Sequence, residues 1–259
     1  MERFPILCDL DGVIWLAHQP IAGSVEAVAS LRNNGHRVLF VTNNSAATVA
    51  EQERTLARIG IEARGDVLTS AQAGGRLVAP AERVLVCGGP GIVEAVTARG
   101  AEIVAHADSD TAAIDAVIVG FHRTFDYDVM RRASTAIRRG ARLIGTNEDA
   151  TYPTPEGPIP GGGSILAAIA TASGVTPLVA GKPHRAMADL VSEVLGAIPG
   201  DAIMVGDRPS TDGEFAATMG CRYALVRSGV TPPGDTSIPV RVDFDVADLR
   251  ALARSLVEP

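Results

Sequence analysis

The sequence predicts an α/β protein with parallel strands, and three observations support this fold class. Short apolar runs alternate along the chain with longer amphipathic segments, which is the pattern of successive βα units. Glycine follows two of the predicted helices, at Gly35 and Gly60, where a residue that tolerates positive φ is favoured. With 259 residues, 46% of them hydrophobic, the chain can bury a large core in one or two domains.

The predicted elements follow one another in this alternating order. The apolar runs predict strands at residues 4–8, 37–41, 83–87, 116–121, 143–145, 178–180, 202–205 and 223–226. The amphipathic segments predict helices at residues 25–34, 48–59, 92–99 and 128–139. The longest irregular stretch, residues 147–163, holds four prolines and four glycines. A loop of this length in a compact domain is usually functional.

Composition and charge narrow the possible partners. No run approaches the roughly 18 apolar residues that cross a bilayer, and the first residues lack the apolar segment of a signal peptide, so we expect a soluble, cytoplasmic protein without a membrane partner. A net charge of −7 argues against a general nucleic-acid binder. Three cysteines without a paired spacing suggest neither a disulfide framework nor a zinc site.

Polar residues gather where four predicted strands end. The clusters are Asp9 to Gly12, Thr42 to Ser45, Gly181 to Pro183 and Gly206 to Asp212. Parallel strands of one sheet share a carboxyl edge, and ligands of open α/β sheets bind outside that edge. We therefore expect residues distant in sequence to converge there on one site.

Asp9 and Asp11 are predicted to be a pair of cooperating catalytic carboxylates. Two residues apart on an extended chain, their side chains leave the backbone on the same side. One can attack phosphorus to form an acyl phosphate, and the other can protonate the leaving oxygen and then activate water. Asp9 and Asp11 fit these roles in that order. The alternative is a structural Asp-x-Asp-Gly turn.

Attack of a carboxylate on a phosphate dianion needs a cation between the two negative groups, so the chemistry predicts bound Mg²⁺. Mg²⁺ takes oxygen ligands, and Asp9, the main-chain carbonyl of Asp11 and the carboxylate of Asp207 would supply them. Asp212 can hold Asp207 or a metal-bound water. A helix N-cap is the alternative for Asp212.

Two further clusters fit a bound phosphate. Thr42, Asn43 and Asn44 offer hydroxyl, amide and main-chain donors before a helix, although a capping sequence looks the same. Lys182 precedes Pro183, which favours an extended backbone that would hold the ammonium at the sheet edge. There Lys182 can neutralise charge during phosphoryl transfer, whereas a lone lysine is more often a solvated surface residue.

The order and content of the four clusters resemble the haloacid dehalogenase (HAD) superfamily of phosphohydrolases, and in particular its nitrophenylphosphatase-like subfamily IIA. The family pattern is Asp-x-Asp-Gly, Thr-Asn-Asn, Gly-Lys-Pro and Gly-Asp followed by a second aspartate, and all four occur here in order. The resemblance implies Asp9 as nucleophile, Asp11 as general acid and base, and Lys182 as the clamp on the phosphate. It also implies Thr42, Asn43 and Asn44 at the phosphate, Asp9, Asp11 and Asp207 at Mg²⁺, and Asp212 in support of the metal.

The resemblance also implies the domain organisation. A Rossmann-like parallel-sheet core would comprise residues 1–80 and 178–259, interrupted by an inserted α/β cap at residues 81–177. A cap loop of this family reaches over the active site, and residues 146–153 look like that loop. Tyr152 is expected to face the leaving group, with packing inside the cap as the alternative. Pro209, Ser210 and Gly213 depart from the usual fourth motif and leave the placement of Asp212 open.

The substrate stays open within one class, small phosphorylated metabolites. Candidates are glycerol phosphate, phosphoglycolate, pyridoxal phosphate, nucleoside monophosphates and the synthetic p-nitrophenyl phosphate. A non-catalytic binding module and a phosphotransferase that uses the same intermediate are the rival functions. Relatives often dimerise through the cap, so a homodimer is possible.

Two other features have weaker functional interpretations. Residues 88–91, Gly-Gly-Pro-Gly, form an incomplete nucleotide-binding pattern and fit a strand-to-helix turn better. Arginines crowd one cap segment, which can be an anion-attracting face but is more often a solvated helix surface. They are Arg131, Arg132, Arg138, Arg139 and Arg142.

Overall fold

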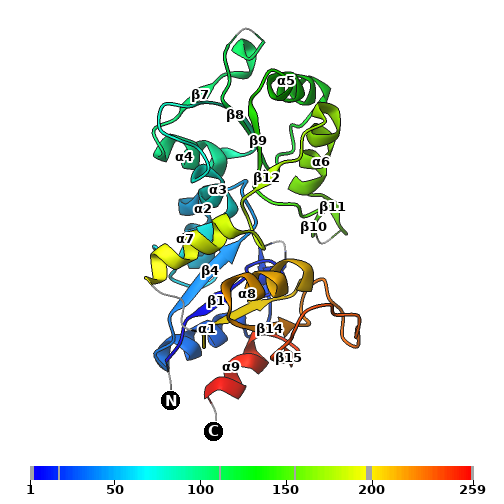
Figure 1. Cartoon of the computed structure of the whole chain (residues 1–259). Helices are drawn as coiled ribbons and strands as arrows, with labels where there is room; N and C mark the ends of the chain where they lie inside the picture. The colour runs from blue at the N-terminus through cyan, green and yellow to red at the C-terminus, as the bar shows by residue number, and fades with distance from the viewer. Residues whose placement is uncertain (1–2, 17, 111, 155, 197–199, 258–259) are drawn as a thin grey trace.

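The protein folds into two lobes, each built around its own parallel sheet (Figure 1). The computed structural model describes residues 3–16, 18–110, 112–154, 156–196 and 200–257. Within these residues no helix is long and apolar enough to cross a membrane. Both chain ends lie in the lower lobe, and the middle of the chain forms the upper one (Figure 1).

The lower lobe contains a six-stranded sheet in the order β15-β14-β13-β1-β4-β5, in which all neighbours run parallel. Its strands are β1 (Ile6–Cys8), β4 (Val38–Thr42), β5 (Val67–Thr69), β13 (Ile203–Gly206), β14 (Arg222–Val226) and β15 (Phe244–Val246). Strand order reverses between β4 and β13, on either side of β1. Asp9 therefore follows the strand at the switch point, where open α/β sheets bind ligands.

Helices cover both faces of this sheet, so its central strands are apolar throughout. Ile6 and Cys8 face a core that includes Leu31 and Leu252, whereas Leu7 faces a core that includes Val191. The helices of this lobe are α1 (Ser24–Asn33), α2 (Val49–Arg58), α3 (Ser70–Gly75), α7 (Arg185–Leu195), α8 (Glu214–Met219) and α9 (Leu249–Val257). Burial on both faces explains why β1 and β4 read as continuous apolar runs.

The upper lobe contains a five-stranded parallel sheet in the order β12-β9-β8-β6-β7. Its strands are β6 (Arg83–Cys87), β7 (Glu102–Val104), β8 (Ala116–Val119), β9 (Arg142–Gly145) and β12 (Leu178–Val179). It also holds α4 (Pro90–Ala98), a short helix at His106–Asp108, α5 (Tyr127–Arg138) and α6 (Gly162–Ser173). Small hairpins pair β2 (Trp15–Leu16) with β3 (Gln19–Pro20) and β10 (Thr151–Tyr152) with β11 (Ile159–Pro160).

The α/β class and the parallel sheets are confirmed, and one predicted limit is wrong. The predicted core resumes at residue 178, yet Leu178–Val179 pairs with β9 in the upper sheet. The backbone N–H groups of Ala180 and Gly181 continue that ladder by donating to the carbonyls of Gly145 and Thr146. The chain thus returns to the lower lobe only at Lys182. The other cap limit, at residue 81, stays a prediction.

The two lobes meet through the carboxyl ends of their strands. A Cβ on Gly89 or Gly91, after β6, would collide with the main chain at Ala46 or Ala47, after β4. Ser45 and Thr146 share a hydrogen bond of 2.9 Å between their hydroxyl oxygens. The glycines at 88–91 therefore allow the two lobes to pack closely and lie where α4 begins. This agrees with a strand-to-helix turn rather than a nucleotide-binding loop.

Candidate active site

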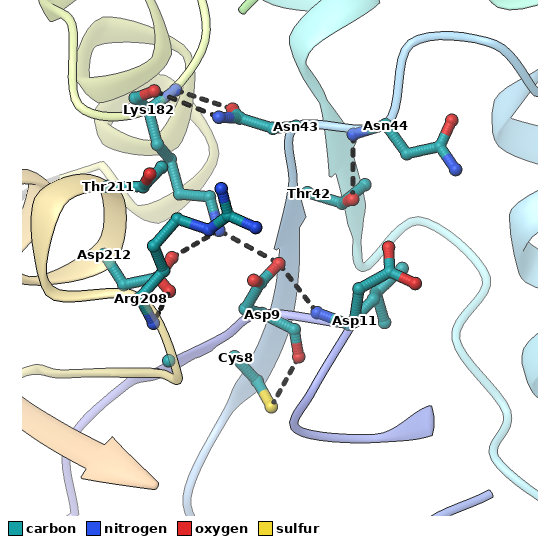
Figure 2. Close-up of polar contacts among 12 residues, drawn as sticks. Cys8, Asp9, Asp11, Thr42, Asn43, Asn44, Lys182, Arg208, Thr211 and Asp212 are labelled. Atoms are coloured by element: carbon teal, nitrogen blue, oxygen red, sulfur yellow. Dashed lines mark hydrogen bonds and ion pairs between the residues drawn. The ribbon is translucent and has the colours of Figure 1, made fainter. Parts of the chain in front are cut away.

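A buried lysine holds the centre of the site together. Lys182 Nζ lies 3.0 Å from Asp9 Oδ1 and 2.7 Å from Asp212 Oδ1, and only 1% of its side chain is exposed. Figure 2 shows these three side chains converging. The solvated-surface alternative for Lys182 is thereby excluded. Burial alone would lower the pKa of Lys182, but the carboxylates of Asp212 and Asp9 outweigh it and raise that pKa.

Asp207 is placed by the loop that follows β14. The Val230 N–H donates to Asp207 Oδ2 at 2.6 Å, and the Thr231 hydroxyl donates to the Asp207 carbonyl at 2.5 Å. Gly12, with a φ of +84°, and Gly229 lie so close that a Cβ on either would collide with the Asp207 carboxylate. The glycine of the first cluster is therefore needed to admit the aspartate of the fourth.

Three carboxylates can hold a metal ion together. Each of Asp9, Asp207 and Asp212 offers an oxygen, and these oxygens lie within 4.8 Å of one another; no other such cluster occurs in the part of the chain described. Burial raises the pKa of Asp9 despite Lys182, and burial followed by repulsion from Asp212 raises that of Asp207 to about 7. Such a cluster of hard oxygen donors suits a divalent cation like Mg²⁺.

Asp212 lies within a helical turn at Pro209–Gly213 and does not cap a helix. Its Oδ1 accepts from Lys182, and its Oδ2 accepts from the Arg208 N–H at 3.1 Å. Because both oxygens already accept from protein donors, Asp212 suits a role that supports the metal ligands. The capping alternative is wrong, since the turn at Pro209–Gly213 begins before Asp212 and α8 begins after it.

Asp11 is set apart from Asp9 and faces the cavity. The indole N–H of the buried Trp15 donates to Asp11 Oδ1 at 3.2 Å and fixes the carboxyl group. Burial raises the pKa of Asp11, which is the direction that a general acid needs. The side chain of Asp11 is not part of the carboxylate cluster, which is consistent with a ligand role for its carbonyl alone.

The side chain of Asn43 has a different task from the one predicted. Its Oδ1 accepts from the Lys182 N–H at 2.8 Å, and its Nδ2 donates to the Lys182 carbonyl at 3.0 Å (Figure 2). The same Nδ2 also donates to Asp149 Oδ2 at 3.0 Å. Both amide hydrogens and the amide oxygen are thus engaged. If Asn43 contacts the phosphate, it would have to do so through its main chain, and this contact stays a prediction.

Thr42 and Asn44 shape the loop after β4. The Asn44 N–H donates to Thr42 Oγ1, and the Ala46 N–H donates to Asn44 Oδ1, both at 3.0 Å. These side chain to main chain bonds turn the chain toward α2. Both residues line the same cavity as Asp9, and their contact with phosphate stays a prediction.

The upper lobe supplies the opposite wall of this cavity. Tyr152 stacks on Phe121 of the upper lobe with ring centroids 5.4 Å apart, and it lines the cavity at the same time. Burial raises the pKa of Tyr152, so its phenol stays protonated. The lining residues from the upper lobe are Phe121, Asn147, Asp149, Thr151, Tyr152, Pro153, Gly161 and Gly162.

Among the cavity residues that were not predicted individually, three contact one another. Asp149 bonds to Asn43, lies 3.7 Å from Arg208 Nη1 and accepts from Thr211 Oγ1 at 3.4 Å. All three unpredicted residues, Asp149, Arg208 and Thr211, line the cavity. Asp149 lies in the predicted cap loop, and the other two lie between the aspartates of the fourth cluster, so the signal was their position within these segments.

The five arginines between residues 131 and 142 do not line the cavity. Arg131 pairs with Asp110 and Asp128, and Arg132 pairs with Asp128. Arg138, Arg139 and Arg142 each donate to a main-chain carbonyl, and Arg142 also pairs with Glu82. All five are thus paired with nearby acids or main-chain carbonyls, which favours the structural interpretation of this segment.

Comparison with known proteins identifies the class of protein. A family model for haloacid dehalogenase-like hydrolases matches residues 6–102, and a HAD-hydrolase-like model matches residues 179–252. The chain is 38% identical to D-glycerol 3-phosphate phosphatase from Mycobacterium tuberculosis, across 97% of this chain and 71% of that protein. The protein is therefore a phosphoric monoester hydrolase.

Solved structures agree with this class. Glycerol phosphate phosphatase from Mycobacterium tuberculosis in complex with magnesium has a TM-score of 0.86 and 36% identity, covering 96% of this chain and 75% of that one. The p-nitrophenyl phosphatase from Archaeoglobus fulgidus has a TM-score of 0.87 and 29% identity, covering 97% and 98%. The chain belongs to the HAD-like hydrolase family, with relatives of the nitrophenylphosphatase-like subfamily IIA.

Proposed function

We propose that the protein hydrolyses phosphate monoesters of small metabolites with Mg²⁺, through a phosphorylated Asp9. The observation that carries this proposal is the position of the Asp9 carboxylate, 3.0 Å from the buried Lys182 ammonium and clustered with Asp207 and Asp212. A nucleophile beside fixed positive charge, at the switch point of a parallel sheet, is suited to phosphoryl transfer.

Mg²⁺ fits the donor set of the site. Asp9, Asp207 and the carbonyl of Asp11 would hold it, and Asp212 would support them by holding Lys182 and the Arg208 N–H. When bound, the ion neutralises charge on the phosphate and on the attacking carboxylate. The magnesium complex of the M. tuberculosis glycerol phosphate phosphatase supports the same cation here.

The reaction divides into two displacements at phosphorus. In the first, an oxygen of Asp9 forms a bond to phosphorus while the ester P–O bond breaks and Asp11 gives its proton to the leaving oxygen. In the second, Asp11 takes a proton from a water molecule that attacks phosphorus, and the bond to Asp9 breaks. Lys182 stabilises the negative charge near Asp9 in both steps.

The cap would enclose the leaving group. Tyr152 and Phe121 offer an aromatic wall, and Asn147 and Thr151 offer hydrogen-bonding groups on the same side of the cavity. A small polar alcohol such as glycerol fits these surroundings, and the name of the M. tuberculosis relative supports glycerol phosphate as a candidate substrate. Enclosure by the cap would keep bulk water away during the first step.

The test is phosphate release from p-nitrophenyl phosphate and from a panel of phosphorylated metabolites. We expect turnover with Mg²⁺ and none after chelation with EDTA, with recovery when Mg²⁺ is restored. Asp9→Asn, which keeps the shape of the side chain, is the matched control without the nucleophile. Full activity of that variant, or full activity in EDTA, would contradict the proposal.

A further inference from the structure

The indole of Trp15 connects the hydrophobic core of the lower lobe to the carboxyl group of Asp11. Trp15 is only 1% exposed and belongs to the same core cluster as Ile6 and Leu10. Its Nε1–H donates to Asp11 Oδ1 at 3.2 Å. Asp11 lines the catalytic cavity, whereas Trp15 does not. Any effect of the indole N–H on the reaction must therefore pass through Asp11.

The indole has a fixed position from which it can hold this carboxyl group. The Trp15 N–H donates to the Leu10 carbonyl at 3.2 Å, and the Trp15 carbonyl accepts from the Gly12 N–H at 2.8 Å. The ring of His18 packs edge-on against the indole, with ring centroids 5.3 Å apart. An aspartate carboxyl group otherwise rotates over a broad range of angles. The hydrogen bond from Trp15 thus restricts the rotation of the Asp11 carboxyl group.

The same hydrogen bond makes the two oxygens of Asp11 unequal. Oδ1 accepts from the indole, and within the described residues no hydrogen bond is donated to Oδ2. A protonated carboxyl group carries its proton on one oxygen and accepts with the other. Because the indole N–H is a donor only, it favours the form of Asp11 in which Oδ1 accepts and Oδ2 carries the proton.

We propose that Trp15 is a positioning residue for the proton transfers of Asp11. Its N–H keeps the proton on Oδ2 and holds this oxygen toward the leaving group. In the first step the proton moves from Oδ2 to the leaving oxygen, which keeps the electron pair of the breaking P–O bond, while Asp9 forms its bond to phosphorus. This inference rests on the proposed phosphatase function and adds a residue that acts through Asp11.

The experiment varies how strongly the leaving oxygen needs a proton. The three substrates are p-nitrophenyl phosphate, phenyl phosphate and glycerol 3-phosphate, whose leaving oxygens increase in basicity in that order. Trp15→Phe keeps an aromatic ring and removes the N–H donor. With Mg²⁺ we expect its loss of kcat/KM to increase in the same order, from less than about twofold for the first to roughly tenfold for the last. Asp11→Asn should show the same order with larger losses.

Ile14→Val is the matched packing control. Ile14 is fully buried in the same core cluster, next to Trp15 in the sequence, and its side chain has no hydrogen-bonding group. Any loss of kcat/KM in this variant should be the same for the three substrates. Adding Trp15→Phe to Asp11→Asn should not steepen the dependence on the leaving group, because two residues that act through one hydrogen bond are not additive.

The outcomes separate this inference from the proposed function. Equal losses on all three substrates in Trp15→Phe, or a steeper dependence when it is added to Asp11→Asn, would overturn the proposal. Trp15 is the only tryptophan of the chain, so 3-benzothienylalanine, which has sulfur in place of the N–H, can replace it selectively if Trp15→Phe does not fold. Absence of phosphate release from all three substrates by the wild-type protein would instead mean that the proposed function has failed.

Discussion

The two lobes use the same architecture for different purposes. Each has a parallel sheet whose strand ends point at the junction, and the lower lobe carries a buried, interlocked set of ionisable groups there, with Lys182 between Asp9 and Asp212. The upper sheet presents glycine after its strands and places a half-buried aromatic pair at the cavity. In our proposal the lower edge carries the groups that react with the phosphate. The upper edge lets the two lobes pack closely and selects the substrate.

The difference has an energetic side. Removing one member of a buried ion pair leaves the other charge uncompensated, which costs far more than the loss of a half-exposed contact. Substitutions at the lower edge should therefore affect stability, metal binding and turnover together. Substitutions on the cap wall should mainly change which substrates are accepted.

Lys182→Met is expected to have the largest effect of the predicted substitutions. Without the ammonium, Asp9 and Asp212 face each other as buried carboxylates, which should lower the free energy of unfolding of the metal-free protein by about 3–5 kcal/mol. Loss of charge stabilisation should also reduce kcat by roughly 10²–10³-fold. Urea unfolding in EDTA and p-nitrophenyl phosphate turnover in Mg²⁺ measure the two effects. A variant with wild-type kcat would show that Lys182 has no role in the reaction.

The acidic cluster should make metal-dependent stability sensitive to pH. The folded-state pKa of Asp207 is raised to about 7, above its unfolded value, so the metal-free protein should lose stability as pH rises from about 4 to 7. Mg²⁺ binds the ionised carboxylate and competes with the proton. The increase in Tm caused by saturating Mg²⁺ should therefore grow over this range and level off above it.

Asp207→Asn is the control for this pH dependence, because it cannot ionise. In that variant the Mg²⁺-induced increase in Tm should be small and should depend less on pH. Thermal unfolding followed by circular dichroism, with Mg²⁺ and with EDTA, measures both proteins. A wild-type Tm increase that is the same at pH 5 as at pH 8 would contradict the assignment of Asp207 to the metal.

Tyr152→Ala tests the cap wall and should have the smallest effect. If Tyr152 contacts the leaving group, its loss should reduce kcat/KM by roughly tenfold for some phosphate esters and little for others. Tyr152→Phe, which retains the stacking surface toward Phe121, separates the ring from the hydroxyl. The same change in kcat/KM for all substrates would contradict a leaving-group contact. It would also mean that Tyr152 of the upper lobe does not select the substrate.

Much of the catalytic edge could be predicted because each cluster is contiguous in sequence. Asp9 and Asp207 each follow a strand of the lower sheet, and parallel strands bring such residues to one edge whatever their separation along the chain. Lys182 follows β12 of the upper sheet and joins them because the two lobes meet through their strand ends. The same reasoning identified residues 146–153 as the segment that reaches the site. The aspartates meet there as expected, since the geometry depends on the sheet order.

What could not be predicted depends on contacts between distant segments. Asn43 holds Lys182 because these two residues, 139 positions apart in the sequence, pack against each other in the fold. The role of Asp149 follows from the approach of the cap loop to Arg208 and Thr211, which no local pattern encodes. The sheet to which Leu178–Val179 belongs could not be predicted, because a two-residue apolar strand fits either sheet until its partner, β9, is known.

The central claim is that Asp9 carries the phosphoryl group between the two steps. Rapid acid quenching of the protein during turnover of a ³²P-labelled phosphate ester in Mg²⁺, followed by peptide mapping, tests it most directly. We predict label that is stable in acid, labile to hydroxylamine and confined to the peptide that contains Asp9, and no label in Asp9→Asn. Turnover without protein-bound label, or label on another residue, would contradict this account.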